Sequence, residues 1–502
     1  MLLLQSSDLK TKLQRLISLS LYILPILGIL LACTNIFTPY SFWLDEIYSV
    51  TTSELSFFSM LRALLLDVHP PLYQSLLWVW IRFFGEYEPF VRGLSLFCSL
   101  TSVIFLYHSC RCLDFWSRWL TVTFYSSSWL FSFYAQEARS YALLLLLSTL
   151  LICWFINDDG QKKYFLKILL VSILLALTHY FGLILASAVL SWLFLSNVRR
   201  PKRLYLILIT CVVMLVWPTI EYFYGALGTQ TGGNFWIQSS VSQSILTTFL
   251  LAISPVLKTW GDKLYLILTS CSFVLIASLL LYRIKIDRII HATQERLMIW
   301  KLIFCAVWVV IFVTLIDMHT PISTDRNYIV LLPVISLIFG FAFGVLGNKF
   351  HLIVCVVIAT SIFSVLQLNY SYAVLSNKWM PLQNWKAAAQ YLVNEGKGHQ
   401  LYYLKIDQFE RMDRIFNKNK IVNYYLRKIS HDNKVLSPID LPTLMTISGA
   451  TLLFIDGAPK SLIETIQHMP NLNLQETFYP DQYWQNSMAV LRIRPSSNNS
   501  EK

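Results

Sequence analysis

The chain has 502 residues, of which 56% are hydrophobic and only 14% are charged, and its mean hydropathy is +0.55. In a soluble protein about a quarter of the residues are charged, so this composition excludes an ordinary soluble globular protein. The net charge of +12 does not indicate nucleic-acid binding, because much of it lies in short clusters between apolar runs, where basic residues set membrane orientation.

Apolar runs recur along residues 17–368 and predict an α-helical polytopic membrane protein. The run at 17–37 predicts a retained helix rather than a signal peptide, because it is too long and has no small-x-small cleavage site. Basic residues at positions 10–15 place the N-terminus in the cytoplasm. Run length and the basic loops predict about eleven spans: 17–37, 90–107, 118–134, 139–157, 164–177, 181–196, 204–224, 264–282, 297–316, 328–346 and 351–368.

Three further apolar pieces, at 55–66, 72–84 and 245–257, are too short or too amphipathic to cross a bilayer. We expect them to lie along the outer membrane face, the first two as juxtamembrane helices of the first external loop. The nine cysteines lie in or beside apolar runs, which makes a disulfide framework unlikely to be part of the fold.

The composition changes near residue 370. A helical pattern at 384–392 is followed by strand-like runs at 401–406, 451–455 and 488–493. The sequence therefore predicts a transmembrane domain of residues 1–369 and a small C-terminal α/β domain of residues 370–502 outside the membrane.

The predicted orientation gathers acids and bases on the extracytoplasmic face: Asp45, Glu46, His69, Arg92, Glu137, Arg139, His179 and Arg326. Acids this close to hydrocarbon are costly and indicate function by default. A carboxylate there can act as a general base, and arginines can hold a phosphate by bidentate contacts and stabilise it as a leaving group. The set suits attack on a sugar that is attached to a lipid phosphate.

Each of these residues also has a structural interpretation. Asp45 and Glu46 could form an N-cap pair at the start of a helix. The others could be interfacial or snorkelling side chains, a local ion pair or the end of a span: His69, Arg92, Glu137 with Arg139, His179, and Asp325 with Arg326. No metal-ligand spacing stands out, so no cofactor is predicted, while a divalent cation is left open.

Six stretches in this order carry a family resemblance: Trp43-Leu44-Asp45-Glu46, His69-Pro70-Pro71-Leu72-Tyr73, Arg92-Gly93-Leu94-Ser95, Gln136-Glu137-Ala138-Arg139-Ser140-Tyr141, Thr178-His179-Tyr180-Phe181-Gly182 and Arg326-Asn327-Tyr328. The ordered set resembles the membrane glycosyltransferases of the GT-C superfamily. It is most similar to the bacterial branch related to the dolichyl-phosphate-mannose–protein mannosyltransferases and the aminoarabinose transferase of lipid A.

The resemblance implies the GT-C fold, a polyprenyl-phosphate-sugar donor, and transfer to a lipid, glycan or protein acceptor at the periplasmic face of the inner (plasma) membrane. It implies Asp45 as the catalytic base, with Glu46 orienting the acceptor or sharing that role. It assigns carrier-phosphate or donor binding to His69, Tyr73, Arg92, Arg139 and Arg326, and acid pairing or the acceptor side to Glu137 and His179.

There are two departures from the family pattern. His69 stands where the aminoarabinose branch has a lysine, and the C-terminal domain is not similar to the inserted luminal domain of the mannosyltransferases, so acceptor identity is not carried over. Two other functions stay open: a flippase or other transporter of lipid-linked sugars, and a polysaccharide polymerase or ligase of the cell envelope. A transporter should place polar groups along a path near the bilayer midplane.

Overall fold

A computed structural model describes the chain at residues 26, 28–30, 32–33, 41–66, 69–110, 113–158, 160, 162–224, 241, 245, 276–283, 285, 293–349, 384–404, 423–430, 435–444, 446, 449–456, 460–469, 472–478 and 488–494. The chain forms two compact units. Unit 1 comprises Met1–Phe37, Leu64–Leu76 and Arg92–Tyr372, and unit 2 comprises Thr38–Ala63, Leu77–Val91 and Ala373–Lys502. Each unit is described by itself.

Unit 1 is a bundle of apolar helices: α5 (Glu88–Ser109, entering from unit 2), α6 (Phe115–Ser127), α7 (Trp129–Tyr134), α8 (Tyr141–Ile156), α9 (Lys162–Ala176), α10 (Tyr180–Ser196), α11 (Pro201–Phe223), α15 (Thr293–Asp317), the 3₁₀ helix η4 (Asp325–Leu331) and α16 (Leu332–Lys349). Within the described residues, four stretches are long and apolar enough to cross a membrane: Glu88–Ser109, Pro201–Phe223, Glu295–Asp317 and Arg326–Gly344. The chain is a membrane protein.

One predicted span differs from the structure. The run at 118–134 is broken at Ser128, whose extended backbone (φ −62°, ψ 136°) separates α6 from α7. Three successive serines at 126–128 favour such a break, because their hydroxyls compete for nearby backbone groups. The segments 17–37, 245–257, 264–282 and 351–368 lie wholly or mostly outside the described residues, so the count of eleven stays a prediction.

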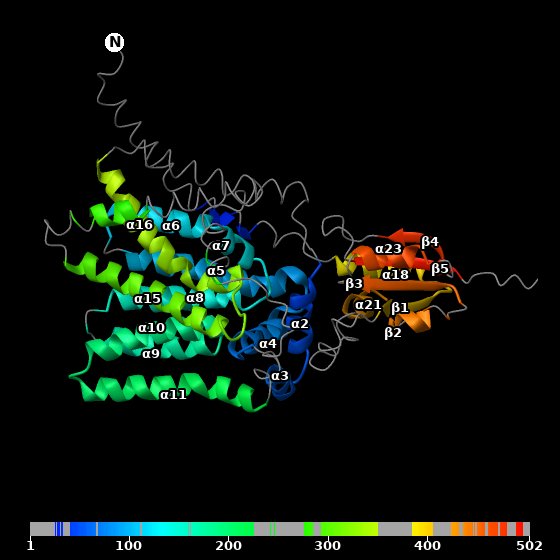
Figure 1. The fold of residues 1–502 in the computed structure, drawn as a ribbon, viewed down its shortest axis with the longest axis horizontal. Coiled ribbons are helices and arrows are strands. Elements are labelled where there is room, and N and C mark those ends of the chain that lie inside the picture. The colour runs from blue at the N-terminus through cyan, green and yellow to red at the C-terminus, as the bar shows by residue number, and fades with distance from the viewer. Residues whose placement is uncertain are drawn as a thin grey trace, which may run out of the picture. The chain divides into compact units, whose positions relative to one another are not determined.

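Helices α8, α9, α10 and α11 lie side by side in alternating directions (Figure 1). The ends at which α9 and α11 begin carry the basic residues. There, Arg203 donates to the carbonyl of Gly160 at 2.6 Å, and Lys301 of α15 donates to the carbonyl of Phe155 at 2.7 Å. The turns that contain Arg139 and His179 lie at the other end of the same helices. The helices of unit 1 thus have basic residues at one end and most of the predicted site residues at the other.

The pair formed by α6 and α16 depends on glycines. A Cβ on Gly340 would lie 2.5 Å from the carbonyl oxygen of Ser117 and 2.7 Å from the backbone nitrogen of Thr121, and one on Gly344 would lie 2.9 Å from the Cα of Ser117. Small residues four positions apart allow two membrane helices to approach this closely. Arg283 reinforces the contact, since it donates to the Ser117 hydroxyl at 2.7 Å and to the Phe341 carbonyl at 2.8 Å.

We therefore expect Gly340→Val to lower the thermal unfolding midpoint of the purified protein by several degrees, because α16 must move away from α6. Overpacking costs about 1–3 kcal/mol. Ile338→Val, on a half-buried position of the same helix, is the control and should leave the midpoint nearly unchanged. Equal midpoints for Gly340→Val and the wild type would show that the helices do not need this close approach.

Unit 2 contains the first external loop, which forms α2 (Leu44–Ser53), α3 (Phe57–Leu64) and α4 (Leu72–Phe84). Helix α4 has the bounds expected from the sequence. Its Trp78 donates to the Leu55 carbonyl at 2.9 Å, and Arg82 donates to the Ser53 carbonyl at 3.2 Å while its guanidinium lies 3.4 Å from the centroid of the Trp78 ring. These contacts fold α4 back onto the turn between α2 and α3.

The C-terminal part of unit 2 is a mixed five-stranded sheet of β1 (Gln400–Leu404), β2 (Ser437–Ile439), β3 (Thr451–Asp456), β4 (Asn473–Phe478) and β5 (Met488–Arg494) in the order β2-β1-β3-β5-β4. Strands β2, β1 and β3 are parallel, whereas β5 is antiparallel to β3 and β4. The strands expected at 451–455 and 488–493 are confirmed, and β1 covers the part of the run at 401–406 that the structure describes. The three-residue β2 and the polar β4 are too short or too hydrophilic to be recognised in the sequence.

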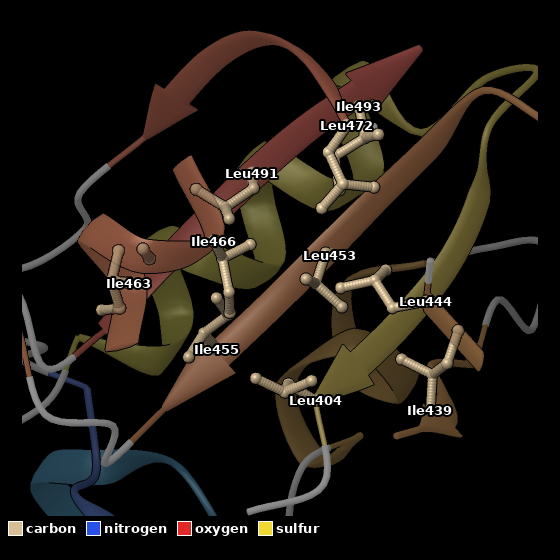
Figure 2. Close-up of a cluster of buried hydrophobic side chains, with 11 residues drawn as sticks. Leu404, Ile439, Leu444, Leu453, Ile455, Ile463, Ile466, Leu472, Leu491 and Ile493 are labelled. Atoms are coloured by element: carbon tan, nitrogen blue, oxygen red, sulfur yellow. The ribbon is translucent and has the colours of Figure 1, made fainter. Parts of the chain in front are cut away.

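Four helices accompany the sheet: α18 (Trp385–Glu395), α21 (Tyr424–Ile429), α22 (Leu441–Leu444) and α23 (Lys460–Gln467). Figure 2 shows the core on one face, where side chains of β3, β5, α22 and α23 meet: Leu444, Leu453, Ile455, Ile463, Ile466, Leu491 and Ile493. On the other face of β3, Phe454 contacts Trp385 of α18, with ring centroids 5.4 Å apart, and α18 packs against α21. The boundary predicted at residue 370 lies outside the described residues.

Candidate functional site

The centre of the candidate site is a pair of nitrogen-bearing side chains from two turns of unit 1. Nη2 of Arg139 lies 3.1 Å from Nε2 of His69. Arg139 is buried in the turn before α8, and His69 is half-buried in the His-Pro-Pro turn before α4. An arginine can only donate, so Nε2 of His69 accepts in this contact.

His179 is the third member of the site. It is the N-cap of α10, and its Nδ1 accepts from the backbone N–H of Phe181 at 3.2 Å. Burial lowers the pKa of His179 to about 3, and the adjacent His69, Arg326 and Arg139 repel its charged form further. His179 is therefore neutral at physiological pH, with its remaining proton on Nε2.

Arg326 enters the same site from η4. Its guanidinium lies 5.7 Å from the centroid of the Tyr141 ring, and that ring lies 5.8 Å from the His179 ring. Tyr141 is the buried first residue of α8. A short hydrogen bond from the backbone N–H of Leu72 to the carbonyl of Leu177, at 2.8 Å, ties the His-Pro-Pro turn to the turn that presents His179.

We call His69, Arg139, His179 and Arg326 the cationic cluster. Two guanidiniums that stay charged at any physiological pH lie beside two imidazoles at the ends of apolar helices, and the imidazole of His179 is neutral. Such a group can bind a phosphate through charge-assisted hydrogen bonds. Among the residues that the structure describes, no three His, Cys, Asp or Glu side chains come together as a metal site.

Three other predicted residues of unit 1 lie near these turns. Glu137 is buried in the Arg139 turn, and its carbonyl accepts from the hydroxyl of Ser95 on α5 at 2.6 Å. Arg92 is buried one helical turn before Ser95, on the same face of α5. Tyr73 is buried on the first turn of α4, four residues after His69.

Asp45 and Glu46 belong to unit 2, where they occupy the first turn of α2. Glu46 is buried, and its Oε2 accepts from the backbone N–H of Trp43, the N-cap residue, at 3.3 Å. Asp45 is half-buried. The helix dipole favours both carboxylates here. Glu46 thus has the helix-capping role that is one interpretation of Asp45 and Glu46. The bond from the Trp43 N–H goes to Glu46 and not to Asp45.

Glu221 of α11 is not among the predicted site residues. It is fully buried, and its carboxylate accepts hydrogen bonds from the Tyr180 hydroxyl and from Nε1 of Trp217. Tyr180 directly follows His179, so this acid lies at the same end of the helices as the cationic cluster. The sequence could have indicated this residue, because Glu221 is a lone carboxylate within the apolar run at 204–224. A buried carboxylate in such a run is costly unless it has partners.

The lowered pKa of His179 predicts a pH dependence of stability. The unfolded chain binds a proton at His179 below a pKa of about 6.5, whereas the folded protein binds it only below about 3. The stabilisation from neutral His179 is therefore complete above pH 6.5 and is lost as the pH falls toward 3, at about 1.4 kcal/mol for each pH unit. His179→Asn keeps an N-cap acceptor and should show a smaller loss between pH 7 and pH 4.5.

The measurement is thermal unfolding of the purified proteins across that pH range. His319→Asn, at an exposed histidine after α15, should follow the wild-type curve. Parallel curves for wild type and His179→Asn would contradict the buried neutral state.

No family model matches the sequence, and no curated protein matches it. Among solved structures, ArnT from Cupriavidus metallidurans in the apo state superposes with a TM-score of 0.55 at 11% identity, over 95% of this chain and 98% of that chain. ArnT bound to undecaprenyl phosphate gives 0.52 at 11% identity, over 94% and 97%.

An oligosaccharyltransferase from Archaeoglobus fulgidus gives a TM-score of 0.47 at 11% identity, over 84% of this chain and 62% of that chain. The ArnT superpositions extend over nearly the whole length of both chains. The GT-C fold that the six sequence stretches imply is confirmed.

Proposed function

We propose that this GT-C chain is an integral-membrane glycosyltransferase. It moves one sugar from a polyprenyl-phosphate donor to a lipid, glycan or protein acceptor. The reaction takes place at the extracytoplasmic face of the inner membrane, with the N-terminus in the cytoplasm and the C-terminal domain outside it.

The observation that carries this proposal is the cationic cluster. The guanidinium of Arg139 can form two parallel hydrogen bonds to a phosphate, and Arg326 adds a second permanent charge. His69 lies beside Arg139, and Nε2–H of neutral His179 can donate without a net positive charge. The full-length likeness to a protein that has been solved with bound undecaprenyl phosphate supports a polyprenyl phosphate as the ligand.

The proposed reaction is a direct displacement. The acceptor hydroxyl oxygen attacks the anomeric carbon while Asp45 takes its proton as general base. The bond from the anomeric carbon to the phosphate oxygen breaks, the phosphate leaves with the bonding electrons, and the anomeric configuration inverts. Arg139 and Arg326 stabilise the charge that develops on the phosphate, so the scheme uses no cofactor.

A transporter of lipid-linked sugars is the main alternative. Transport needs polar groups along a path through the bilayer, whereas the cluster residues lie in turns or at helix ends. This placement favours the transferase. A polymerase or ligase would share the same chemistry and would differ in its product, a chain rather than a single added sugar.

Mass spectrometry of envelope glycolipids and glycoproteins from a deletion strain tests the proposal. We expect one component to lose the mass of a single sugar, and the wild-type gene to restore it. An unchanged profile would contradict the proposed transfer. Loss of a whole glycan chain would identify a polymerase or ligase instead.

A further inference from the structure

The C-terminal domain holds the residues that lead into α2. The backbone N–H of Phe42 donates to the hydroxyl of Tyr425, on α21, at 2.7 Å. The Phe42 side chain is fully buried, and its ring centroid lies 6.5 Å from that of Tyr425 and 6.2 Å from that of Tyr424. All of these residues belong to unit 2.

The same tyrosine hydroxyl links this segment to the start of α5. It donates to Oε1 of Glu88 at 3.1 Å, and Nζ of Lys386 lies 3.2 Å from the same oxygen. Glu88 and Tyr425 are both about 5% exposed. Hydrogen bonds to charged groups in buried surroundings are among the stronger ones in proteins.

A second contact fixes the preceding residue. The backbone N–H of Lys386, in the first turn of α18, donates to the hydroxyl of Ser41 at 3.2 Å, and that hydroxyl donates to the Phe42 carbonyl at 3.0 Å. The next residue, Trp43, is bound by Glu46 as described above. The hydroxyl of Ser41 and the backbone of Phe42 and Trp43 are therefore held just before the turn that carries Asp45.

We propose that Glu88, Lys386 and Tyr425 form a clamp by which the C-terminal domain positions α2 and its Asp45. The clamp residues are positioning residues: they act through the hydroxyl of Ser41 and the backbone of Phe42. This inference rests on the proposed function for its catalytic consequence, because a base displaced by about 1 Å can lose up to a hundredfold in rate. It gives the C-terminal domain a role in the reaction whichever acceptor is used.

The clamp is separable from the folding of the C-terminal domain. The hydrophobic cluster on one face of the sheet consists mainly of residues from the strands, α22 and α23, and none of the three clamp residues belongs to that cluster. Tyr425→Phe removes one hydroxyl and keeps the ring packed against Phe42. Tyr391→Phe is the matched control, because the Tyr391 hydroxyl donates to Glu476 at 2.9 Å within the same domain, away from α2.

Hydrogen exchange of the full-length protein is the primary test. We expect amides of residues 41–53 to exchange about tenfold faster in Tyr425→Phe than in the wild type or in Tyr391→Phe, with the exchange of β3 and β5 unchanged. Lys386→Met removes the contact of Nζ with Glu88 and keeps the backbone bond to Ser41, so it should change the exchange in the same direction by a smaller factor. Unchanged exchange at 41–53 in both clamp variants would overturn the proposal.

Kinetics provide the second test. In Tyr425→Phe we expect kcat to fall about tenfold with the donor KM within twofold of wild type, because the cationic cluster is untouched. Glu88→Gln, which keeps an acceptor for Tyr425, should retain more activity than Glu88→Ala. Faster exchange with wild-type kcat would overturn the positioning role. A wild-type protein without transferase activity would contradict the proposed function, while exchange would still decide whether the clamp holds α2.

Discussion

Asp45→Asn should abolish sugar transfer, with kcat reduced by about 10²–10⁴-fold, the range that a general base contributes. Asparagine keeps the size of the side chain but cannot accept the proton of the acceptor hydroxyl. Because Asp45 is not a member of the cationic cluster, binding of undecaprenyl phosphate should change little. The measurement is transfer from a supplied polyprenyl-phosphate sugar by the protein reconstituted in vesicles, with carrier binding measured on the same preparations.

Glu54→Gln is the matched control, since Glu54 is an exposed acid that follows the last residue of the same helix. It should transfer at the wild-type rate. Glu46→Gln distinguishes a capping role of Glu46 from a direct role in transfer. Glutamine still has a side-chain oxygen for the N–H of Trp43 and can preserve the cap. Loss of transfer in Glu46→Gln with an unchanged melting temperature would indicate a direct role for Glu46. Full transfer by Asp45→Asn would rule out Asp45 as the base.

The sequence predicts the membrane helices well where hydropathy alone decides. Helices α5, α11 and α15 begin and end within a few residues of the expected runs, since length and apolar content determine them. The break at Ser128 depends on local backbone hydrogen bonding, which hydropathy does not contain. The close contact of α6 with α16 depends on Gly340, and a glycine in an apolar run does not indicate its partner helix.

The cationic cluster is partly predictable for a similar reason. The positive-inside rule places His69, Arg139, His179 and Arg326 at one membrane face, and the structure brings these four together within unit 1. Which side of the membrane that face adopts stays a prediction. The rule gives no distances, so the neutral state of His179 could not be predicted, because it depends on burial and on the particular cations around the ring.

The clamp could not be predicted from sequence at all. Glu88 and Tyr425 are separated by 337 positions, and a buried tyrosine in a short helix has no distinguishing pattern. Residues 38–63 and 77–91 form one compact unit with residues 373–502, and no pattern within the first external loop indicates this association. The periodicity of a single segment predicts its secondary structure but not its contacts with elements far away in the chain.

Arg139→Gln should weaken binding of undecaprenyl phosphate by about 10–100-fold, since a hydrogen bond to a charged group contributes about 1.5–3 kcal/mol and 1.4 kcal/mol corresponds to a factor of ten. The affinity of Arg139→Lys should lie between those of the wild type and Arg139→Gln, because lysine keeps the charge but lacks the planar guanidinium that binds two phosphate oxygens. Titration of the purified protein with undecaprenyl phosphate measures both.

The control for this series is Arg199→Gln, an exposed arginine beside the first turn of α11 at the basic end of the bundle, which should bind like the wild type. Arg139 is itself buried beside His69, so each variant is first compared by thermal unfolding, and only folded preparations are titrated. If Arg139→Gln binds the carrier as tightly as Arg199→Gln does, the cationic cluster is not the phosphate site. If Arg139→Gln and Arg199→Gln lose affinity equally, binding reflects the overall positive charge of the protein. A specific phosphate site requires that only the Arg139 variants lose affinity, and that Arg139→Gln loses more than Arg139→Lys.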